Sequence, residues 1–221
     1  MKLYMAKTYD LQAAQEEQLY GLLDSDRIKK VSVMKSKKER VRSIFAGLLL
    51  RHAFLQAGYG TKAWQYAEIG KGKYGKPYIK GYQDFYYGLS HSGEWVICAV
   101  DTVPVGADIQ EIKPLKMTLA KRFYHEEEYN RLLVLGEIDQ NRQTQEFYVM
   151  WAAKESAVKL SGRGIGAGIS QYVTAADYSY IYDCSEERKI GMRQYQILEG
   201  YIICVCSNTG SFPDLPEIVD L

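Results

Sequence analysis

The sequence lacks a long apolar segment, an excess of charge of one sign, and any wealth of cysteine or histidine. No run of about 18 apolar residues occurs, so a membrane-spanning helix is not expected. The first ten residues lack the basic and then apolar order of a secretory signal, which predicts a cytoplasmic protein. The 28 Lys and Arg residues nearly balance 27 Asp and Glu, and this argues against a dedicated nucleic-acid-binding protein.

Four cysteines are present, and Cys98, Cys204 and Cys206 lie in apolar runs with strand character. The spacing of Cys204 and Cys206 would suit a metal pair, but no second Cys or His pair follows at a zinc-like spacing. Free cysteines are among the most buried residue types, and a cytosolic chain keeps them reduced. We therefore expect buried strand residues rather than a zinc site.

Composition and hydrophobic pattern predict a folded protein with helices and strands. Hydrophobic residues make up 47% of the sequence, as in ordinary folded proteins. The length of 221 residues allows one large domain or two small ones. The clearest helix spans 36–57, because Ser36 and Glu39 match a capping box and Gly58 follows the helix end. Further helices are expected at 12–23, 117–135 and 144–161, strands at 1–10, 95–100, 105–110, 171–182 and 193–206, turns over 66–87, and a loop-like tail near 213–216.

The two halves of the chain resemble each other. The segment Trp95–Val100 matches Tyr201–Cys206 at an offset of 106 residues, and the glycines that end the two long helices, Gly58 and Gly162, differ by 104. Chance recurrence of short apolar strands is the alternative, and duplication is slightly favoured over it. Duplication predicts a joint near 103–105 and a functional site at the seam between the halves.

Asp108 and Gln110 point to one face of the expected strand 105–110, because side chains alternate along a strand. Their oxygens are of the kind that Mg²⁺ takes as ligands. From position alone, however, a polar strand end that faces water is the better interpretation.

Glu155 stands beside the apolar face of the helix 144–161, and Lys159 follows at i+4. This order favours a surface ion pair, which is the better interpretation from position alone. A carboxylate at the rim of an apolar stripe is costly unless it is paired or binds metal. The functional alternative is therefore a metal ligand or base beside a cationic acid.

Among the three histidines, His91 has the most distinctive surroundings, since His52 and His125 occupy ordinary polar positions. It lies in Leu89–Gly93, which we expect to be a tight polar turn before the next strand. Adjacent Ser90 and His91 do not form a nucleophilic pair, because such groups assemble in space. Hydroxyls, backbone N–H groups and an imidazole together suit a phosphate.

Positive charge is concentrated locally. Eight basic residues and a single acid, Glu39, lie between Arg27 and Arg42, and three lysines follow within 71–76. A solvated helix face explains much of this, and a polyphosphate ligand explains it as well. The segment Gly162–Gly168 is reminiscent of a phosphate loop, but it follows a helix and no Gly-Lys-Ser/Thr closes it. A helix stop and loop are favoured there.

Four blocks of sequence stand in register along the chain. They are Gly75–Pro77 (GKP), Leu89–Trp95 (LSHSGEW), Val105–Gln110 (VGADIQ) and Trp151–Lys159 (WAAKESAVK). In their order and spacing the chain resembles the surfactin-type 4'-phosphopantetheinyl transferases over nearly its whole length. The resemblance implies an α+β pseudo-dimer of two similar α/β lobes, each a small antiparallel sheet packed on a long helix. The implied lobes are 1–104 and 105–221, with the active site at their seam.

The resemblance also implies the reaction. The 4'-phosphopantetheine arm of coenzyme A moves to a serine of an apo acyl or peptidyl carrier protein, and adenosine 3',5'-bisphosphate is released. The implied partner surface is a basic and apolar region around 111–135 that attracts an acidic carrier helix. Neither nucleic acid nor membrane is an expected partner, and an internal pseudo-dimer predicts a monomer.

Individual roles follow from the resemblance. Asp108, Gln110 and Glu155 match the magnesium positions, where Mn²⁺ is an alternative ion, and the implied catalytic residues are Glu155 as base, Lys159 at the scissile phosphate, and His91. The implied coenzyme A contacts are Arg27, Lys30, Arg42, Lys76, Ser90, His91, Asp108 and Lys159. Relatives usually carry Glu at position 110 and commonly Asn at 88, so Gln110 predicts weaker Mg²⁺ binding.

Two other functions compete with the transferase. Gln110 and Gly88 favour a non-catalytic binding module for coenzyme A or carrier protein, with a lapsed metal site. A structural protein with a merely superficial Glu155–Lys159 pair is the third, but it leaves the register of the four blocks unexplained. Turnover, rather than binding, separates the first of these from an enzyme.

Overall fold

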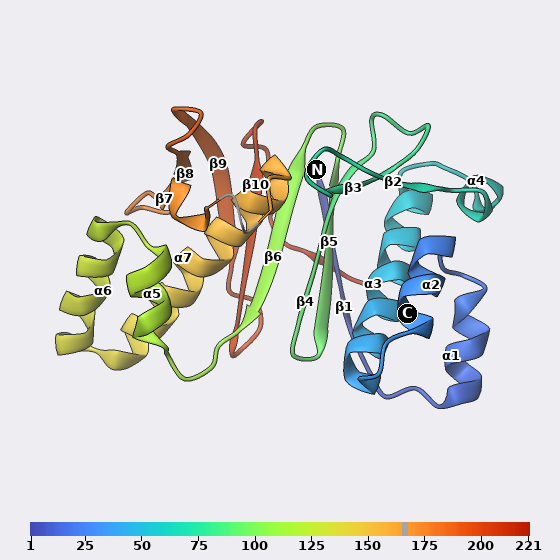
Figure 1. Cartoon of the computed structure of the whole chain (residues 1–221), viewed down its shortest axis with the longest axis horizontal. Helices are drawn as coiled ribbons and strands as arrows, with labels where there is room; N and C mark the ends of the chain where they lie inside the picture. Colours follow the sequence, from blue (N-terminus) through green and yellow to red (C-terminus); the bar gives the residue numbers. More distant parts are fainter. Residues whose placement is uncertain (165–167) are drawn as a thin grey trace.

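Two sheets stand side by side between two groups of helices in the computed structural model, which describes residues 1–164 and 168–221 (Figure 1). The first lobe contains β1 (Lys2–Lys7), α1 (Ala13–Tyr20), α2 (Ser25–Ser32), α3 (Lys37–Gln56), α4 (Thr61–Gln65), β2 (Ile69–Lys71), β3 (Pro77–Ile79), β4 (Tyr86–Ser92) and β5 (Trp95–Asp101). The second contains β6 (Val105–Glu111), α5 (Met117–Phe123), α6 (Glu126–Ile138), α7 (Gln140–Ser161), the 3-10 helix η2 (Ile169–Gln171), β7 (Tyr172–Thr174), β8 (Tyr180–Asp183), β9 (Arg188–Tyr195) and β10 (Tyr201–Ser207). The last strand, β11 (Glu217–Ile218), returns to the sheet of the first lobe.

The strand order gives each lobe its own main sheet, and β2 and β3 pair as a separate two-stranded sheet. The first sheet has the order β11-β1-β5-β4 and packs on α3, whereas the second has the order β6-β10-β9-β8-β7 and packs on α7. Neighbouring strands are antiparallel except β1 and β11, which are parallel. The expected α+β fold, two lobes that each pack a small sheet on a long helix, is therefore confirmed. The matching segments of the two halves form β5 and β10, which contact α3 and α7 respectively.

The central strands are buried on both faces, which explains their continuous apolar runs. In β5, Val96 and Cys98 pack toward α3, whereas Ile97 and Ala99 join a separate cluster of residues from both sheets. That cluster includes Ile203 of β10. The inner faces of the two sheets therefore share one core, and this core holds the lobes together.

The ends of the two long helices follow the sequence signals. Ser36 Oγ accepts the Glu39 N–H at the start of α3, as expected. Helix α7 begins four residues earlier than expected, because the Asp139 carboxylate accepts the N–H groups of the first turn. Gly162 ends α7 in the left-handed conformation with φ 71°, which glycine adopts without steric cost.

Several local expectations were wrong. The region 117–135 forms two helices, because extended Tyr124 breaks the run and donates a hydrogen bond to the Phe147 carbonyl at 2.6 Å. Helix α2 was missed, although Asp24 caps it. His91 lies in strand β4 rather than in a turn, since the turn before β5 comprises only positions 93–94.

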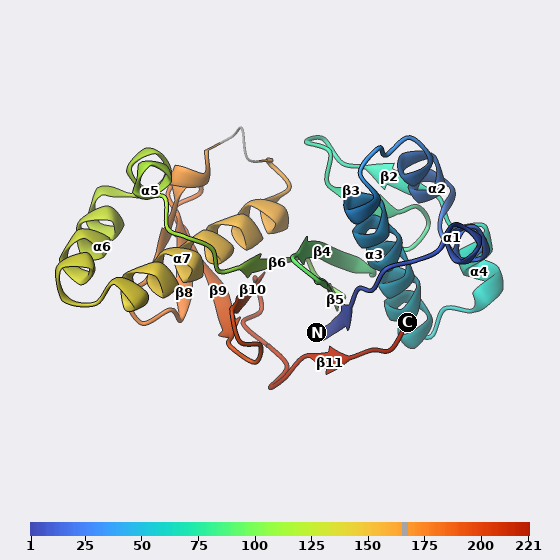
Figure 2. The same cartoon turned by 90° about the horizontal axis from the view of Figure 1, so that it is seen from below.

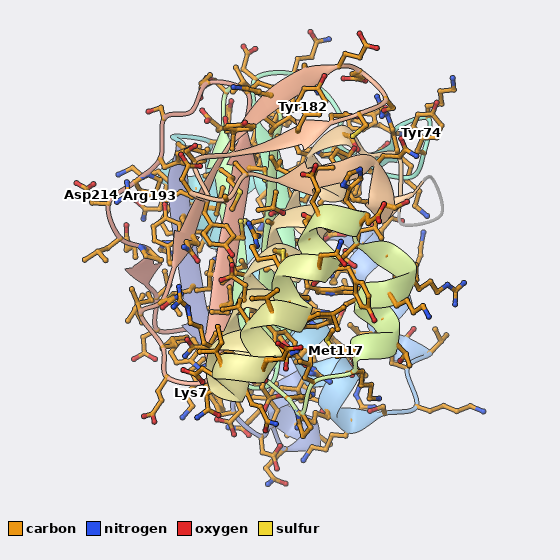
Figure 3. The ribbon with its side chains drawn as sticks, turned by 90° about the vertical axis from the view of Figure 1, so that its left-hand side faces the viewer. Lys7, Tyr74, Met117, Tyr182, Arg193 and Asp214 are labelled. Atoms are coloured by element: carbon orange, nitrogen blue, oxygen red, sulfur yellow. The ribbon has the colours of Figure 1, made fainter. Side chains whose placement is uncertain are left out.

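The tail also departs from expectation, because it is not merely a loop. In the view of Figure 2 it runs along the lower side of the picture and returns to the first lobe, where the Val219 N–H donates to the Met5 carbonyl at 2.8 Å. Tyr195 holds its start by donating to the Pro213 carbonyl at 2.8 Å. Figure 3 shows Arg193 beside Asp214 at the edge of the molecule, where their closest charged atoms are 3.4 Å apart.

None of the helices in the described ranges is both long enough and apolar enough to span a membrane. All four cysteines are free, with Cys98, Cys204 and Cys206 fully buried in strands, as expected.

Candidate active site

The lobes meet most closely where β4 lies against β6. A Cβ added to Gly88 would lie 2.9 Å from the Ala107 nitrogen, and one added to Gly106 would collide with the Ser156 carbonyl of α7. Glycine at both positions therefore permits the close packing of β4, β6 and α7. This packing explains why glycine occupies position 88, since a larger side chain there would push the lobes apart.

A cluster of charged and polar groups spans this seam. Asp108 Oδ1 on β6 accepts hydrogen bonds from Ser90 Oγ of β4 at 2.7 Å and from Lys159 Nζ of α7 at 2.6 Å. Lys159 Nζ also donates to Ser90 Oγ at 2.9 Å, and Gln110 Nε2 donates to Asp108 Oδ2 at 2.7 Å. Three of the four sequence blocks thus converge on one carboxylate.

Lys159 does not form the ion pair that its position on the helix favoured. Its ammonium pairs with Asp108, which is 2% exposed, instead of with Glu155 one turn away. The interpretation of Asp108 as a strand end facing water is therefore wrong as well. The physical reason is that β6 places a buried carboxylate under α7, and a buried charge binds its partner more strongly than a surface charge does.

Glu155 is buried beside this cluster. Burial and then the negative charge of Asp108 raise its pKa, and the positive charge of Lys159 offsets part of that rise. Among the described residues, its carboxylate has no hydrogen-bond or ion-pair partner. A raised pKa makes a carboxylate a stronger base, and an unpaired carboxylate is available to a ligand.

Glu155 and Lys159 border a hollow of ≈350 Å³ at the seam. Its lining comes from both lobes: Tyr74, Gly75, Lys76, Pro77, Tyr87, Gly88, Leu89, Glu155, Val158, Lys159, Gly162 and Gly164. A larger hollow of ≈740 Å³ adjoins it, shares several of these residues and is rich in tyrosine, but neither Glu155 nor Lys159 lines it. The smaller hollow is therefore the candidate substrate site, because the reactive side chains line it.

His91 of β4 lies next to this cluster, with part of its side chain exposed and part buried. Partial burial and then the positive charges of Arg42, Lys159 and Lys30 lower its pKa, and Glu39 opposes that shift. These influences show that the basic helices α2 and α3 face the same region. Of the local basic cluster, Arg42 and Lys30 thus lie near the site.

The basic residues of α2 and α3 differ in their contacts. Arg42 forms an ion pair with Glu39, but its Nε is buried and has no hydrogen-bond partner in the described chain. Arg27 Nη1 lies 3.4 Å from Ser43 Oγ, and burial together with the charge of Arg27 lowers the pKa of Lys30. An unsatisfied buried donor such as Arg42 Nε fits an anionic ligand.

Lys76 points into the seam. Its ammonium donates to the carbonyls of Val105 at 3.0 Å and Leu160 at 2.9 Å, and burial lowers its pKa to about 8. It thereby connects the β2–β3 hairpin to the start of β6 and the end of α7. No phosphate-facing role is visible in these contacts.

Sequence reasoning missed the role of Lys154. This side chain is fully buried, pairs with Glu128 at 2.7 Å, contacts the Tyr172 carbonyl and lies over the Tyr124 ring. Burial lowers its pKa, and Glu128 opposes that shift. The pair fixes α6 to α7. A lysine in an otherwise buried helical stretch was the available signal.

The residues present fit a hard cation, although no cluster of three or more His, Cys, Asp or Glu in residues 1–164 and 168–221 is suited to a metal. Asp108, Gln110 and Glu155 supply oxygen atoms, which Mg²⁺ prefers. The repulsion that raises the Glu155 pKa is the kind that a bound cation relieves.

Comparison with known proteins gives a separate line of evidence, from sequence similarity. Residues 104–206 match the 4'-phosphopantetheinyl transferase superfamily. A 4'-phosphopantetheinyl transferase of Bacillus subtilis is 31% identical over 221 residues, which is 97% of this chain and 95% of that protein. This chain belongs to the 4'-phosphopantetheinyl transferase family. The transferase psf-1 of Bacillus pumilus is 38% identical over 80% of this chain and 76% of that protein, and Sfp of Bacillus subtilis (strain 168) is 34% identical over 67% and 65%.

The phosphopantetheinyl transferase match at 104–206 includes Asp108, Glu155 and Lys159 of the cluster. The other half of the site, with Ser90 and His91, lies in the first lobe and is covered by the relative that spans 97% of the chain. The resemblance drawn from the four sequence blocks is therefore confirmed.

Proposed function

We propose that this phosphopantetheinyl transferase moves the 4'-phosphopantetheine arm of coenzyme A to a serine of an apo carrier protein and releases adenosine 3',5'-bisphosphate. The observation that carries the proposal is the cluster of Asp108, Lys159 and Ser90 beside the buried Glu155. Such a cluster acts on a phosphoryl group by positioning and by electrostatic stabilisation.

Glu155 is our proposed base. The serine hydroxyl of the carrier must lose its proton as it attacks phosphorus, and a carboxylate with a raised pKa accepts that proton more readily. Its place at the wall of the ≈350 Å³ hollow allows contact with a bound substrate. Lys159, whose ammonium already neutralises Asp108, is proposed to stabilise the leaving phosphate.

We propose that Asp108, Gln110 and Glu155 hold Mg²⁺, or Mn²⁺ in its place. When bound, the cation would neutralise negative charge on the pyrophosphate. Gln110 offers its amide oxygen without a charge, and its amide nitrogen holds Asp108. We therefore expect weaker metal binding than a third carboxylate would give.

The coenzyme A phosphates are proposed to lie between β4 and the basic helices. His91 of β4 lies near the charges of these helices, Ser90 of the same strand contacts Lys159 across the seam, and Arg42 offers an unsatisfied donor. Arg27 and Lys30 extend the positive charge along α2. Lys76 remains in the proposed set as part of the wall of the hollow.

The carrier protein is proposed to dock on the second lobe near α5. Lys113, Lys116, Lys121 and Arg122 are exposed there, and opposite charge steers association. We further propose that the lobes 1–104 and 105–221 act together within a single chain in the cytoplasm. The family membership leaves the choice of carrier open.

The test is intact-mass spectrometry of an apo carrier protein after incubation with this chain, coenzyme A and Mg²⁺. A phosphopantetheine mass gain that disappears with EDTA is expected. Coenzyme A binding without any mass gain on an acyl and a peptidyl carrier would instead favour the non-catalytic module. A gain that survives EDTA would overturn the proposed metal set while leaving the transfer intact.

A further inference from the structure

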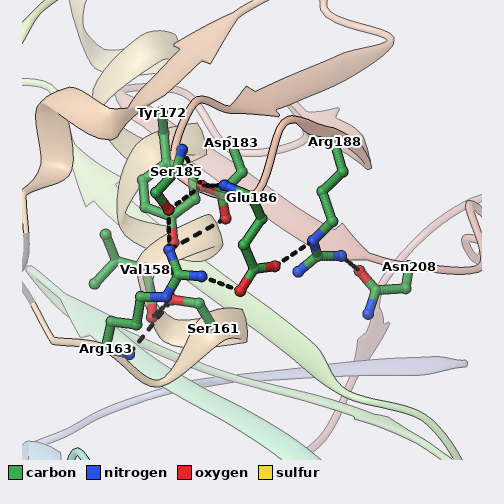
Figure 4. Close-up of polar contacts among 9 residues, drawn as sticks. All are labelled: Val158, Ser161, Arg163, Tyr172, Asp183, Ser185, Glu186, Arg188 and Asn208. Atoms are coloured by element: carbon green, nitrogen blue, oxygen red, sulfur yellow. Dashed lines mark hydrogen bonds and ion pairs between the residues drawn. The ribbon is translucent and has the colours of Figure 1, made fainter.

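A polar network anchors the chain immediately after α7 (Figure 4). The Arg163 guanidinium lies 3.5 Å from Asp183 Oδ2 and also contacts Ser185 Oγ and the Glu186 carboxylate. Asp183, at the end of β8, is fully buried. The network therefore joins the segment after the catalytic helix to the β8–β9 hairpin.

Asp183 organises that hairpin. Its Oδ1 accepts the Ser185 N–H at 3.0 Å, the Ser185 hydroxyl at 2.6 Å and the Glu186 N–H at 3.3 Å, which leaves Oδ2 for Arg163. A buried carboxylate is costly without a cation, and Arg163 is its only ion-pair partner in the described residues. The buried Asp183 carboxylate therefore holds the Arg163 side chain in place, because the arginine supplies the cation that stabilises it.

The backbone of the same segment is fixed from a second direction. Tyr172 of β7 donates to Ser161 Oγ at 2.8 Å, and Ser161 Oγ donates to the Val158 carbonyl at 3.0 Å. The Arg163 N–H points to Ser161 Oγ at 3.4 Å. The last turn of α7 and the residue after it are therefore tied to the second sheet.

Arg163 stands between two glycines that form part of the wall of the candidate site. Gly162 and Gly164 both line the ≈350 Å³ hollow with Glu155 and Lys159. Both glycines have left-handed backbones, with φ 71° and 74°. Glycine restricts its own backbone least of all residues, so this wall keeps its shape only through restraint from neighbours.

We propose that Arg163 is a positioning residue, which fixes the Gly162–Gly164 wall through Asp183 and so maintains coenzyme A affinity. This inference rests on the proposed function. Arg163 itself does not line the hollow or touch the cluster. Its effect on the reaction is indirect, through the position of the two glycines.

The experiment compares Arg163→Met with Arg188→Met in the carrier-modification assay, with kcat and KM for coenzyme A measured separately. Arg188 is the matched control, because it contacts Glu186 at 2.5 Å and Asn208 at 2.7 Å but not the glycine wall. We expect Arg163→Met to raise KM for coenzyme A by roughly 10-fold or more, as positioning residues around a site do. Arg188→Met should leave KM within about two-fold, as surface changes usually do.

Two further variants guard against a folding artefact. Arg163→Lys keeps the charge but loses the planar fork, so it should restore part of the affinity. Asp183→Asn should reproduce the loss, and combining it with Arg163→Met should add little, since both act through one contact. Hydrogen exchange at the Gly162 and Gly164 amides should accelerate in both single variants.

Equal KM in wild type and Arg163→Met, with unchanged exchange at the two glycines, would overturn the positioning role. A KM increase of the same size in Arg188→Met would also overturn it, because the effect would then be general. Failure of the proposed function would give a different result, because the wild type itself would then transfer nothing in the same assay. The hydrogen-exchange measurement would still report whether Arg163 and Asp183 restrain the Gly162–Gly164 wall.

Discussion

Replacing Lys159 by Met tests the central ion pair of the site, because it removes the ammonium and keeps most of the aliphatic stem. The ammonium lies 2.6 Å from Asp108 Oδ1, and the side chain of Asp108 is 3% exposed. Removing one partner of a buried pair costs about 3–5 kcal/mol, because the remaining charge is uncompensated. The Lys159 side chain is 32% exposed, and Ser90 and Gln110 still donate to Asp108. We therefore expect a loss of only about 2–3 kcal/mol in metal-free protein.

The assay is urea unfolding at neutral pH with EDTA, supported by thermal melting. For a chain of this size, the loss corresponds to a melting temperature lower by about 4–12 °C. The double variant Asp108→Asn with Lys159→Met should be more stable than Lys159→Met alone, because no buried charge is left unpaired. The coupling energy from the full cycle should reach about 1–2 kcal/mol.

Activity is a separate readout in this cycle. Lys159→Met and the double variant should both lose carrier modification, so recovery of stability without recovery of turnover separates the two contributions of the pair. The reasoning is refuted if Lys159→Met changes stability by less than about 0.5 kcal/mol, which is the size of an ordinary surface effect. Simple additivity of the two single variants would refute it equally.

Three further predictions follow from the site. Glu155→Gln should abolish transfer without lowering the melting temperature, since burial and Asp108 already disfavour the ionised carboxylate; a parallel loss of both would indicate a structural role instead. Gln110→Glu should lower the Mg²⁺ concentration for half-maximal activity, and an unchanged titration would remove position 110 from the metal site. Burial lowers the pKa of Lys76 to about 8, below its unfolded value, so the unfolded chain binds more protons between these pKa values. The free energy of unfolding of the wild type should therefore increase relative to that of Lys76→Met as pH rises from about 8 to 10.5. Urea titrations at several pH values will measure this difference.

Local sequence signals located the start of α3 and the end of α7, although the equally local cap at Asp24 was overlooked. The capping pattern at Ser36 located α3, and Gly162 located the end of α7, because caps act within one helical turn. Elements decided by distant contacts were missed. The short strand β11 exists through pairing with β1 at the other end of the chain, and its two residues carry no strand pattern.

His91 illustrates an intermediate case. The polar block around it was singled out for its residue types, which suit a phosphate, but its conformation was misjudged. The block alternates Gly88, Ser90 and Ser92 with Leu89 and His91 in strand β4, and hydrogen bonds to β5 extend this strand up to the two-residue turn. Glycine and serine are typical of turns, so the sequence did not indicate a strand that is stabilised by its pairing with β5.

The sequence by itself determined the family, the two-lobed α+β fold and the identity of the residues at the seam, because these depend on the order of the four blocks and on strands buried on both faces. The tertiary structure alone decided which charges pair. Helical spacing predicted an ion pair between Lys159 and Glu155. Packing of β6 under α7 instead placed the buried Asp108 carboxylate 2.6 Å from the Lys159 ammonium. Since the strength of a charge pair depends on burial as well as distance, and burial is a property of the assembled fold, Glu155 was left without a partner in the described chain, beside the hollow where we propose the reaction occurs.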